Sequence, residues 1–221
     1  MEKIILTQTN LFEITDKKGK IHFGGVQYWF PKKGYIPQGA CGATVGANIF
    51  GYLTRTQGDK QIAEPGDLQR KAGFLEFMKK AYPFLYPRAM GLMAEPFMQG
   101  AEEFGASFGV PMRAERLKVP IGRSCRPSAE KLTAFIAESL RRDIPVAHLV
   151  LSSGQTPTLD TWHWITIIGV DEETKIIDFI DNGVRLQADL TRWLETSILG
   201  GSFVRLVPAD DPSSRANASI S

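Results

Sequence analysis

Apolar residues in the second half of the chain form three runs that predict neighbouring strands. Residues 144–151 are almost continuously apolar, which is typical of a central, buried strand. Residues 163–170 form a second run and residues 175–181 a third, and Asn182-Gly183 then supplies one of the strongest hairpin signals. We therefore expect three adjacent antiparallel strands. A short helix over residues 190–194 and a last strand over residues 202–207 should follow.

Helical spacing marks the segment that follows Cys41. Between residues 43 and 54 apolar side chains recur at helical intervals, at Val45, Ile49, Phe50 and Leu53. Gly46 and Gly51 interrupt this pattern, and each costs about 1 kcal/mol relative to Ala inside a helix. Something must offset that cost, so we expect another backbone to approach the helix closely, as it would where a helix is buried against a sheet.

Residues 58–109 also have a mostly helical pattern. We expect Asp67 to cap a helix that runs to Lys80, and a second helix over residues 95–104 that ends at Gly105. The string at residues 105–109 matches the serine-hydrolase pattern G-x-S-x-G, which requires a strand before the serine and a helix after it. Here a helix precedes the serine, so we interpret the match as chance.

Two smaller features complete the expected secondary structure. Residues 11–14 and 20–23 flank a turn that contains Gly19 and predict a hairpin. Ser128 is a candidate N-cap for an amphipathic helix that continues through Leu140.

Length and composition set further bounds. With 221 residues, 43% of them hydrophobic, the chain can bury one core, so we expect a single domain over residues 1–207, with a helical insert at about 58–109 and a disordered tail over 208–221. The net charge of +2 without a basic cluster argues against nucleic acid as a partner. No apolar stretch approaches the roughly 18 residues of a membrane span, and the first residues lack an export signal, so we expect no membrane association and a cytoplasmic location.

Cys41 lies where a glycine-rich loop turns into the first predicted helix. Helix N-termini present unpaired N–H groups and partial positive charge, which favour a thiolate, the nucleophilic form of cysteine. Such a nucleophile needs a base and a group that orients the base. His163, at the start of a strand, and a polar residue at the far end of the following hairpin supply these in the order Cys, His, Asp or Asn. We interpret His22 and His148 as packed strand residues and expect both Cys41 and Cys125 to be reduced.

Other site chemistries find little support in the sequence. The 3 histidines and 2 cysteines are dispersed without metal-ligand spacing, and no phosphate-binding glycine motif is present. We expect neither a metal nor a cofactor.

The arrangement resembles the papain-like cysteine peptidases, and within them the compact bacterial branch that includes the double-glycine leader peptidases. The similarity lies in Cys41-Gly42 opening a buried helix, the strand entry at residues 144–146, the His-aromatic strand over residues 163–171, and Asp181 at the close of the next strand. It covers about half of the chain. The resemblance implies an α+β fold in which a helical subdomain carries the nucleophile helix and packs on an antiparallel β-sheet. It also implies cleavage of a peptide or amide substrate, with Cys41 as nucleophile, His163 as base and Asp181 orienting the base.

Two assignments stay open at this stage. The family's oxyanion Gln usually precedes the nucleophile by six positions, whereas here Gln38 precedes Cys41 by three; aligning Gln38 with the family Gln would put Thr44 at the nucleophile position. The orienting residue is either Asp181 or Asn182. A regular turn at residues 171–174 would direct Asn182 toward His163, whereas a bulge would direct Asp181. We favour Cys41 as nucleophile, with Gln38 and the Cys41 N–H stabilising the oxyanion.

Three functions follow from these assignments. The preferred one is a hydrolase that cleaves a peptide or amide bond through a Cys41 acyl-enzyme. The alternatives are an inactive binding module with Thr44 at the nucleophile position, and an acyltransferase with the same Cys-His-Asp groups.

Overall fold

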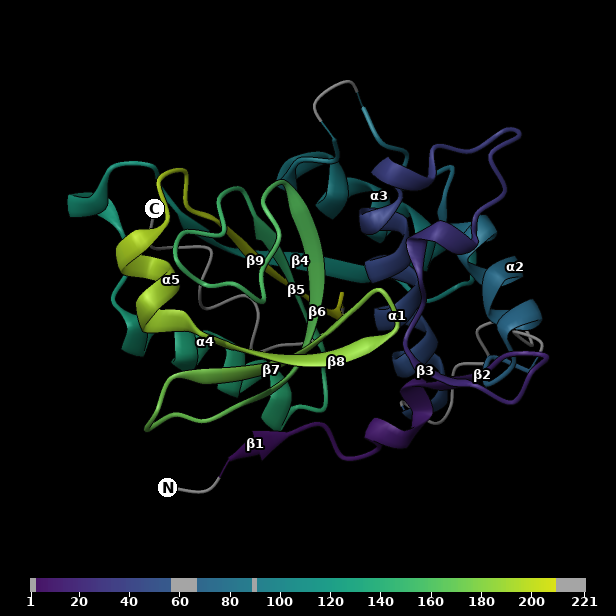
Figure 1. Ribbon diagram of the computed structural model, residues 1–221, viewed down its shortest axis with the longest axis horizontal. Helices are drawn as coiled ribbons and strands as arrows, with labels where there is room; N and C mark the ends of the chain where they lie inside the picture. The colour runs from purple at the N-terminus through teal and green to yellow at the C-terminus, as the bar shows by residue number, and fades with distance from the viewer. Residues whose placement is uncertain (1–2, 57–66, 89–90, 210–221) are drawn as a thin grey trace.

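A computed structural model describes residues 3–56, 67–88 and 91–209 of the chain. The fold is α+β, and a seven-stranded antiparallel sheet forms its centre (Figure 1). The strands are β1 (Ile4–Ile5), β4 (Met112–Val119), β5 (Val146–Val150), β6 (His163–Val170), β7 (Ile176–Asp181), β8 (Val184–Asp189) and β9 (Gly201–Pro208). Their order is β4-β9-β5-β6-β7-β8, with β1 paired to β6. A separate two-stranded sheet consists of β2 (Glu13–Thr15) and β3 (Ile21–Phe23).

The described residues form five α-helices. They are α1 (Cys41–Thr56), α2 (Lys71–Ala81), α3 (Ala94–Ser107), α4 (Ala129–Arg141) and α5 (Leu190–Thr196). Short 3-10 helices occur at Thr9–Phe12 (η1), Gln27–Trp29 (η2), Pro37–Gly39 (η3) and Arg123–Cys125 (η4). In the described part of the chain, no helix is long and apolar enough to cross a membrane.

The predicted strands of the second half are confirmed. The apolar runs become β5, β6 and β7, and Asn182-Gly183 connects β7 to β8. The sequence did not indicate that β9, the last strand, lies between β4 and β5. Nearly all residues of β9 are buried, because strands pair with it on both edges. Residues 210–221 of the predicted tail, and residues 58–66 and 89–90 of the predicted insert, lie outside the described part.

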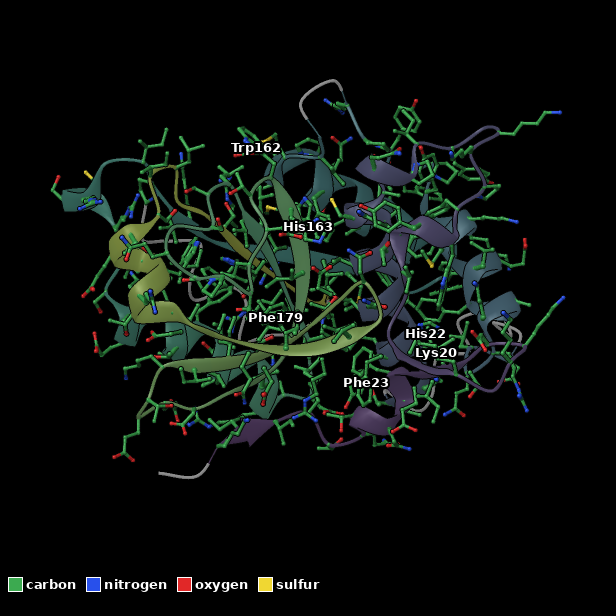
Figure 2. All side chains as sticks on the ribbon, viewed as in Figure 1. Lys20, His22, Phe23, Trp162, His163 and Phe179 are labelled. Carbon is green, nitrogen blue, oxygen red and sulfur yellow. The ribbon has the colours of Figure 1, made fainter. Side chains whose placement is uncertain are left out.

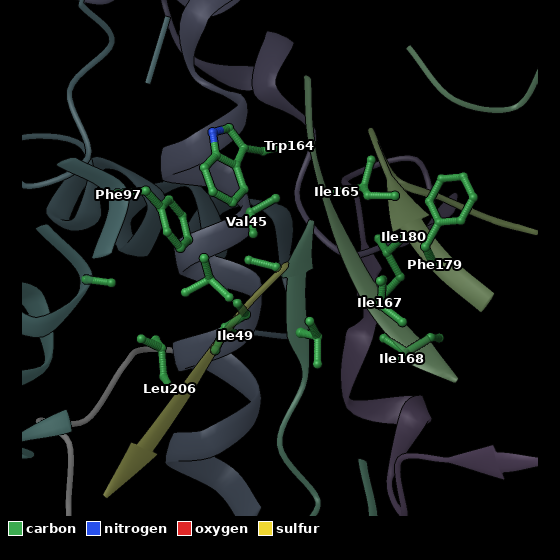
Figure 3. Close-up of a cluster of buried hydrophobic side chains, with 14 of the residues drawn as sticks. Val45, Ile49, Phe97, Trp164, Ile165, Ile167, Ile168, Phe179, Ile180 and Leu206 are labelled. Atoms are coloured by element: carbon green, nitrogen blue, oxygen red, sulfur yellow. The ribbon is translucent and has the colours of Figure 1, made fainter. Parts of the chain in front are cut away.

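The helices cover both faces of the sheet. Helices α1 and α3 pack on one face, and α4 packs against β5 and β6 from the other, with α5 beside it. Figure 3 shows Phe97 and Trp164 between α3, α1 and β6, with their rings stacked at a centroid distance of 4.1 Å. Ile165 and Phe179 lie on the opposite side of β6 in the same view. The predicted packing of the helix that follows Cys41 against an antiparallel sheet is therefore confirmed.

The reason for the glycines in α1 differs from the expectation. A Cβ on Gly46 would lie 2.2 Å from Leu85 Cδ1, and one on Gly51 would make ordinary contacts with the Phe74 and Leu68 side chains. These neighbours are side chains from the segment around α2, so the predicted close approach of another backbone is wrong. At Gly46, close packing of a leucine explains the glycine.

The N-termini of α4 and α2 can be compared with the predicted N-cap residues. Ser128 caps α4, since its hydroxyl accepts a hydrogen bond from the Lys131 N–H at 3.3 Å. Asp67 does not cap α2; its carboxylate accepts from the Gln69 N–H within the preceding turn, and Arg70 occupies the N-cap position.

Helix α3 runs past Gly105 to Ser107, so its predicted end is wrong. The Ser107 hydroxyl donates to the Phe104 carbonyl at 2.6 Å, in the last turn of the helix, and β4 follows. The G-x-S-x-G string is therefore not a strand-to-helix nucleophile elbow.

Candidate active site

Cys41 is the first residue of α1 and is 8% exposed. The 3-10 helix η3 leads the chain directly into this first turn, where backbone N–H groups have no partner within the helix. Gly42 follows because a side chain there would collide with Leu92, whose Cδ2 atom lies 2.5 Å from the position of an added Cβ. Leu92 can thus pack directly over the start of the helix, and the thiol is held in a fixed position.

His163 is the first residue of β6, the strand that packs beside α1 (Figure 2). Its Nε2 atom lies 2.7 Å from Asp181 Oδ1, and both side chains are nearly buried, at 10% and 13% exposure. The His163 side chain also interacts with the Cys41 side chain, with which it lines one small cavity. Since Asp181 occupies Nε2, Nδ1 is the ring nitrogen that remains for the thiol. The structure therefore brings together three of the predicted site residues.

The environment of His163 favours its protonated form. Burial lowers the pKa of the imidazole, but the hydrogen bond with Asp181, the hydrogen bond with Cys41 and the charges of both groups raise it, with a net pKa of about 10. A cation is stabilised there because the Asp181 carboxylate lies against one ring nitrogen and the Cys41 side chain lies on the other side of the ring. At neutral pH the site therefore holds an imidazolium between a carboxylate and the sulfur.

A β-bulge determines which residue orients His163. The pairing of β6 with β7 shifts between Ile167 and Gly169, so that Thr166 lies opposite Ile180. Without this shift Thr166 would lie opposite Asp181, and the Asp181 side chain would point to the face of the sheet away from His163. The extra residue, Ile168, therefore turns Asp181 toward the histidine.

Asn182 forms a hydrogen bond with the chain near Gln27. It adopts a positive φ of 43° at the turn into β8, and its Oδ1 atom accepts a hydrogen bond from the Gln27 N–H at 3.2 Å. Gln27 begins η2 and is 4% exposed. Gln27 lines the same small cavity as Cys41 and His163, and its Oε1 atom is buried without a hydrogen-bond partner in the described part of the chain. Since buried polar groups are normally paired, this amide is a candidate for binding a ligand rather than for holding the fold.

Gln27 was missed by the sequence reasoning. It precedes Cys41 by fourteen positions, because the loop of residues 28–40 intervenes, and no short-range spacing marks it. Its location depends on Asn48, one of the few buried polar residues of α1. Asn48 accepts from the Gly25 N–H at 2.8 Å and donates to the Thr166 hydroxyl at 3.1 Å. Asn48 thereby joins the segment before Gln27 to both α1 and β6.

Thr44 and Gln38 occupy other environments. The Thr44 hydroxyl lies near the small cavity but donates to the Ala40 carbonyl at 2.9 Å, one turn earlier. The exposed Gln38 lines a larger cleft, of about 720 Å³, on the other side of Cys41. Cys41 lines both spaces, so the sulfur lies between the His163 cavity and this cleft.

The cleft has mainly apolar walls. Trp164 and Leu149, opposite one another on β6 and β5, form part of it, and the indole N–H of Trp164 donates to the Leu92 carbonyl at 2.6 Å. Three of its residues, Ile36, Tyr86 and Trp162, are exposed hydrophobic side chains. Figure 2 shows Trp162 directly before His163. The cleft is thus open to solvent along an apolar rim.

The remaining histidines and the second cysteine lie elsewhere. His22 contacts Asp16 at 3.5 Å and the Trp29 ring, and His148 is fully buried between Trp193 and Phe203. Cys125 is exposed, and neither cysteine forms a disulfide. Among the residues that the structure describes, no group of three or more His, Cys, Asp or Glu side chains is arranged to hold a metal ion.

Comparison with known proteins gives similarity in structure only. No family model matches the sequence, and no curated protein does. The structure is similar to the peptidase domain of Streptococcus ComA, a bifunctional ABC transporter involved in quorum sensing, with 12% identity, a TM-score of 0.45, and coverage of 78% of this chain and 94% of that one. It is also similar to the Pseudomonas avirulence protein AvrPphB, with 12% identity, a TM-score of 0.34, and coverage of 76% and 92%. Neither similarity decides the reaction.

Proposed function

We propose that this chain is a cysteine-dependent hydrolase that cleaves a peptide or amide bond through an acyl-enzyme on Cys41. The observation that carries the proposal is the position of His163, between the Asp181 carboxylate at 2.7 Å and the Cys41 side chain. A histidine with a purely structural role does not require a thiol at a helix N-terminus beside it. A cysteine nucleophile, in contrast, requires a general base and a group that orients the base.

Acylation begins from the imidazolium–thiolate pair. The Cys41 thiolate attacks the carbonyl carbon of the substrate, so that an S–C bond forms and the carbonyl electrons move to oxygen. The oxyanion is stabilised by the Cys41 N–H and, in place of the predicted Gln38, by the side-chain amide N–H of Gln27, which lines the same cavity. The His163 imidazolium then gives its proton to the leaving nitrogen, the C–N bond breaks, and the amine departs.

Deacylation reverses the role of the histidine. Neutral His163 accepts a proton from water as the water oxygen attacks the thioester carbonyl. The C–S bond breaks, the carboxylic acid leaves, and the proton on His163 restores the ion pair with Cys41. Asp181 keeps Nε2 occupied in both steps, so Nδ1 always faces the sulfur.

The test compares the two cysteines with iodoacetamide at mildly acidic pH. Accessibility alone predicts faster alkylation of Cys125, which is exposed, than of Cys41, which is buried. The ion pair predicts the opposite order, because a thiolate reacts and a thiol does not. We expect Cys41 to react at least about tenfold faster, measured by peptide mass spectrometry.

Variants isolate the cause of this reactivity. Cys125→Ser should leave the fast reaction intact, whereas His163→Ala should abolish it. Thr44→Val serves as a matched control, because the nucleophile alternative at Thr44 predicts loss of function and our proposal predicts retention. Equal reactivity of Cys41 and Cys125 in the unmodified protein would contradict the proposal.

Acyl transfer uses the same first half-reaction, with an amine in place of water. Product analysis in the presence of an added amine distinguishes the two outcomes. A free acid as the main product is the result expected for a hydrolase.

A further inference from the structure

The cleft beside Cys41 has an unusual distribution of charge. Among the described residues that line it, Arg88 is the only charged one, and none carries a carboxylate. The other lining residues are Ile36, Gln38, Gly39, Cys41, Tyr86, Pro87, Gly91, Leu92, Met93, Leu149, Trp162 and Trp164. A bound substrate therefore meets one cation on an otherwise apolar or neutral surface.

Arg88 has no salt-bridge partner among the residues that the structure describes. Its side chain is exposed, and its backbone carbonyl accepts a hydrogen bond from the Gly91 N–H at 2.8 Å. Arg88 and Glu103 both line a separate cavity of about 300 Å³, which is not the one beside His163. The Glu103 carboxylate accepts a hydrogen bond from the Gln99 side chain at 2.8 Å. Arg88 thus keeps its full hydrogen-bonding capacity for a ligand.

Described residues on both sides of Arg88 pack next to the nucleophile helix and the loop before it. On one side of Arg88, Pro87 packs so closely on the loop before Cys41 that a Cβ on Gly39 would lie 2.7 Å from its ring. On the other side, Leu92 packs on Gly42 at the start of α1. Pro87 and Leu92 therefore pack against Gly39 and Gly42, glycines that lie before and after Cys41 in the chain. A mobile surface arginine would lack this coupling to the site.

We propose that Arg88 is a specificity residue, which selects peptides that present a carboxylate in the cleft next to apolar residues. The inference rests on the proposed hydrolase function and names its substrate class. A guanidinium binds a carboxylate through two parallel N–H donors, a geometry that neither an amide nor a hydroxyl reproduces. The exposed Ile36, Tyr86 and Trp162 side chains on the rim supply the apolar contacts beside it.

The carboxylate can belong to a Glu or Asp side chain or to a peptide C-terminus, and the test separates these sources. One arm uses tetrapeptide acyloxymethyl ketones, which alkylate an active-site cysteine, with a single Glu or Gln placed at each position in turn. The second arm uses quenched fluorescent peptides that end in a free acid or in an amide. The measured quantities are the second-order rate of Cys41 alkylation and the value of kcat/KM.

We expect Glu to exceed Gln by about three- to tenfold at one position, or the acid to exceed the amide by a similar factor, as for a partly exposed ion pair. The preference should shrink as salt is added, because ions screen exposed charges. In Arg88→Gln the ratio should fall to about one. In Arg88→Glu it should invert, so that a Lys peptide reacts faster than a Glu peptide. Arg192→Gln, on the exposed surface of α5, is the matched control and should keep the original ratio.

The outcomes distinguish this inference from the function on which it rests. If neither iodoacetamide nor any peptide ketone alkylates Cys41 faster than Cys125, the hydrolase proposal fails. If Cys41 reacts rapidly but no position and no terminus shows a charge preference, the role of Arg88 is overturned while the hydrolase proposal stands. A preference that survives in Arg88→Gln also overturns it.

Discussion

The protonation of His163 gives the most direct test of the site, because it needs no substrate. The pKa of about 10 lies some 3.5 units above the ordinary value of 6.5. At about 1.4 kcal/mol per unit, this difference corresponds to roughly 5 kcal/mol that favours the imidazolium over the neutral ring. The Asp181 hydrogen bond of 2.7 Å is the largest of the causes that raise this pKa. A buried hydrogen bond to a charged group contributes about 1.5–3 kcal/mol, so Asp181→Asn should lower the pKa of His163 by about 1–2 units.

The sign of the effect on stability follows from the same pKa. A group whose pKa is raised by folding stabilises the native state fully below its unfolded pKa of about 6.5, and this stabilisation is lost as the pH rises through about 10. Near pH 7 it is almost complete, so Asp181→Asn should reduce the free energy of unfolding there by about 2 kcal/mol. The loss should become smaller above pH 10.

The assay is a pH titration followed by long-range proton–nitrogen NMR spectra of the imidazole rings. The chain has only 3 histidines, so the signals can be assigned with single His→Gln variants. Cys41→Ser should also lower the pKa of His163, since it removes the interactions with the Cys41 sulfur that raise this pKa. If His163 titrates near 6.5 in the unmodified protein, or if Asp181→Asn leaves its pKa unchanged, the imidazolium described here does not exist.

Three further predictions concern the core and the oxyanion site. Burial lowers the pKa of His148 to about 3, and neither ring nitrogen has a hydrogen-bond partner among the described residues. The native state therefore resists protonation of this ring, and the free energy of unfolding decreases as the pH falls below about 6.5. In urea unfolding, the stability of His148→Leu relative to the unmodified protein should rise by about 2–3 kcal/mol between pH 7.5 and pH 4.5, and parallel stability profiles of the two proteins would refute this. Gln27→Ala should lower kcat by about a hundredfold or more, as loss of an oxyanion donor does, while Gln38→Ala should change kcat little. A larger loss of kcat in Gln38→Ala than in Gln27→Ala would identify Gln38 as the oxyanion donor. Gly46→Ala should destabilise the folded protein by about 1–3 kcal/mol, because the added Cβ would lie 2.2 Å from Leu85 Cδ1. Helix propensity alone predicts the opposite, a stabilisation of about 1 kcal/mol, and thermal unfolding distinguishes the two outcomes.

Local patterns in the sequence were sufficient for most of the secondary structure around the site. Apolar runs identified β5, β6 and β7, and helical spacing identified α1. These elements are specified by which faces must be buried, and that information recurs every two or 3.6 residues along the chain. The same patterns placed Cys41 at a helix start and His163 at a strand start, which are the positions that the structure gives them.

Caps and glycines were less predictable. Asp67 and Gly105 carry the residue types of helix ends, yet α2 begins later and α3 continues further. Such residues also serve turns and close packing, and only the surrounding structure selects among these uses. Gly46 was recognised as needing an explanation, but the leucine that explains it lies in a distant segment.

The sequence alone therefore determined the groups that can react and the elements that carry them. Tertiary structure decided which polar residues join them: the extra residue Ile168 in β6 turns Asp181 rather than Asn182 toward His163, and the Asn48 hydrogen bonds bring Gln27 to the cavity that Cys41 lines. The physical reason is that strand register and loop placement arise from long-range pairing and packing, which leave no periodic signal in the chain. A shift of one residue in register changes no local pattern, but it reverses the direction of every side chain beyond it.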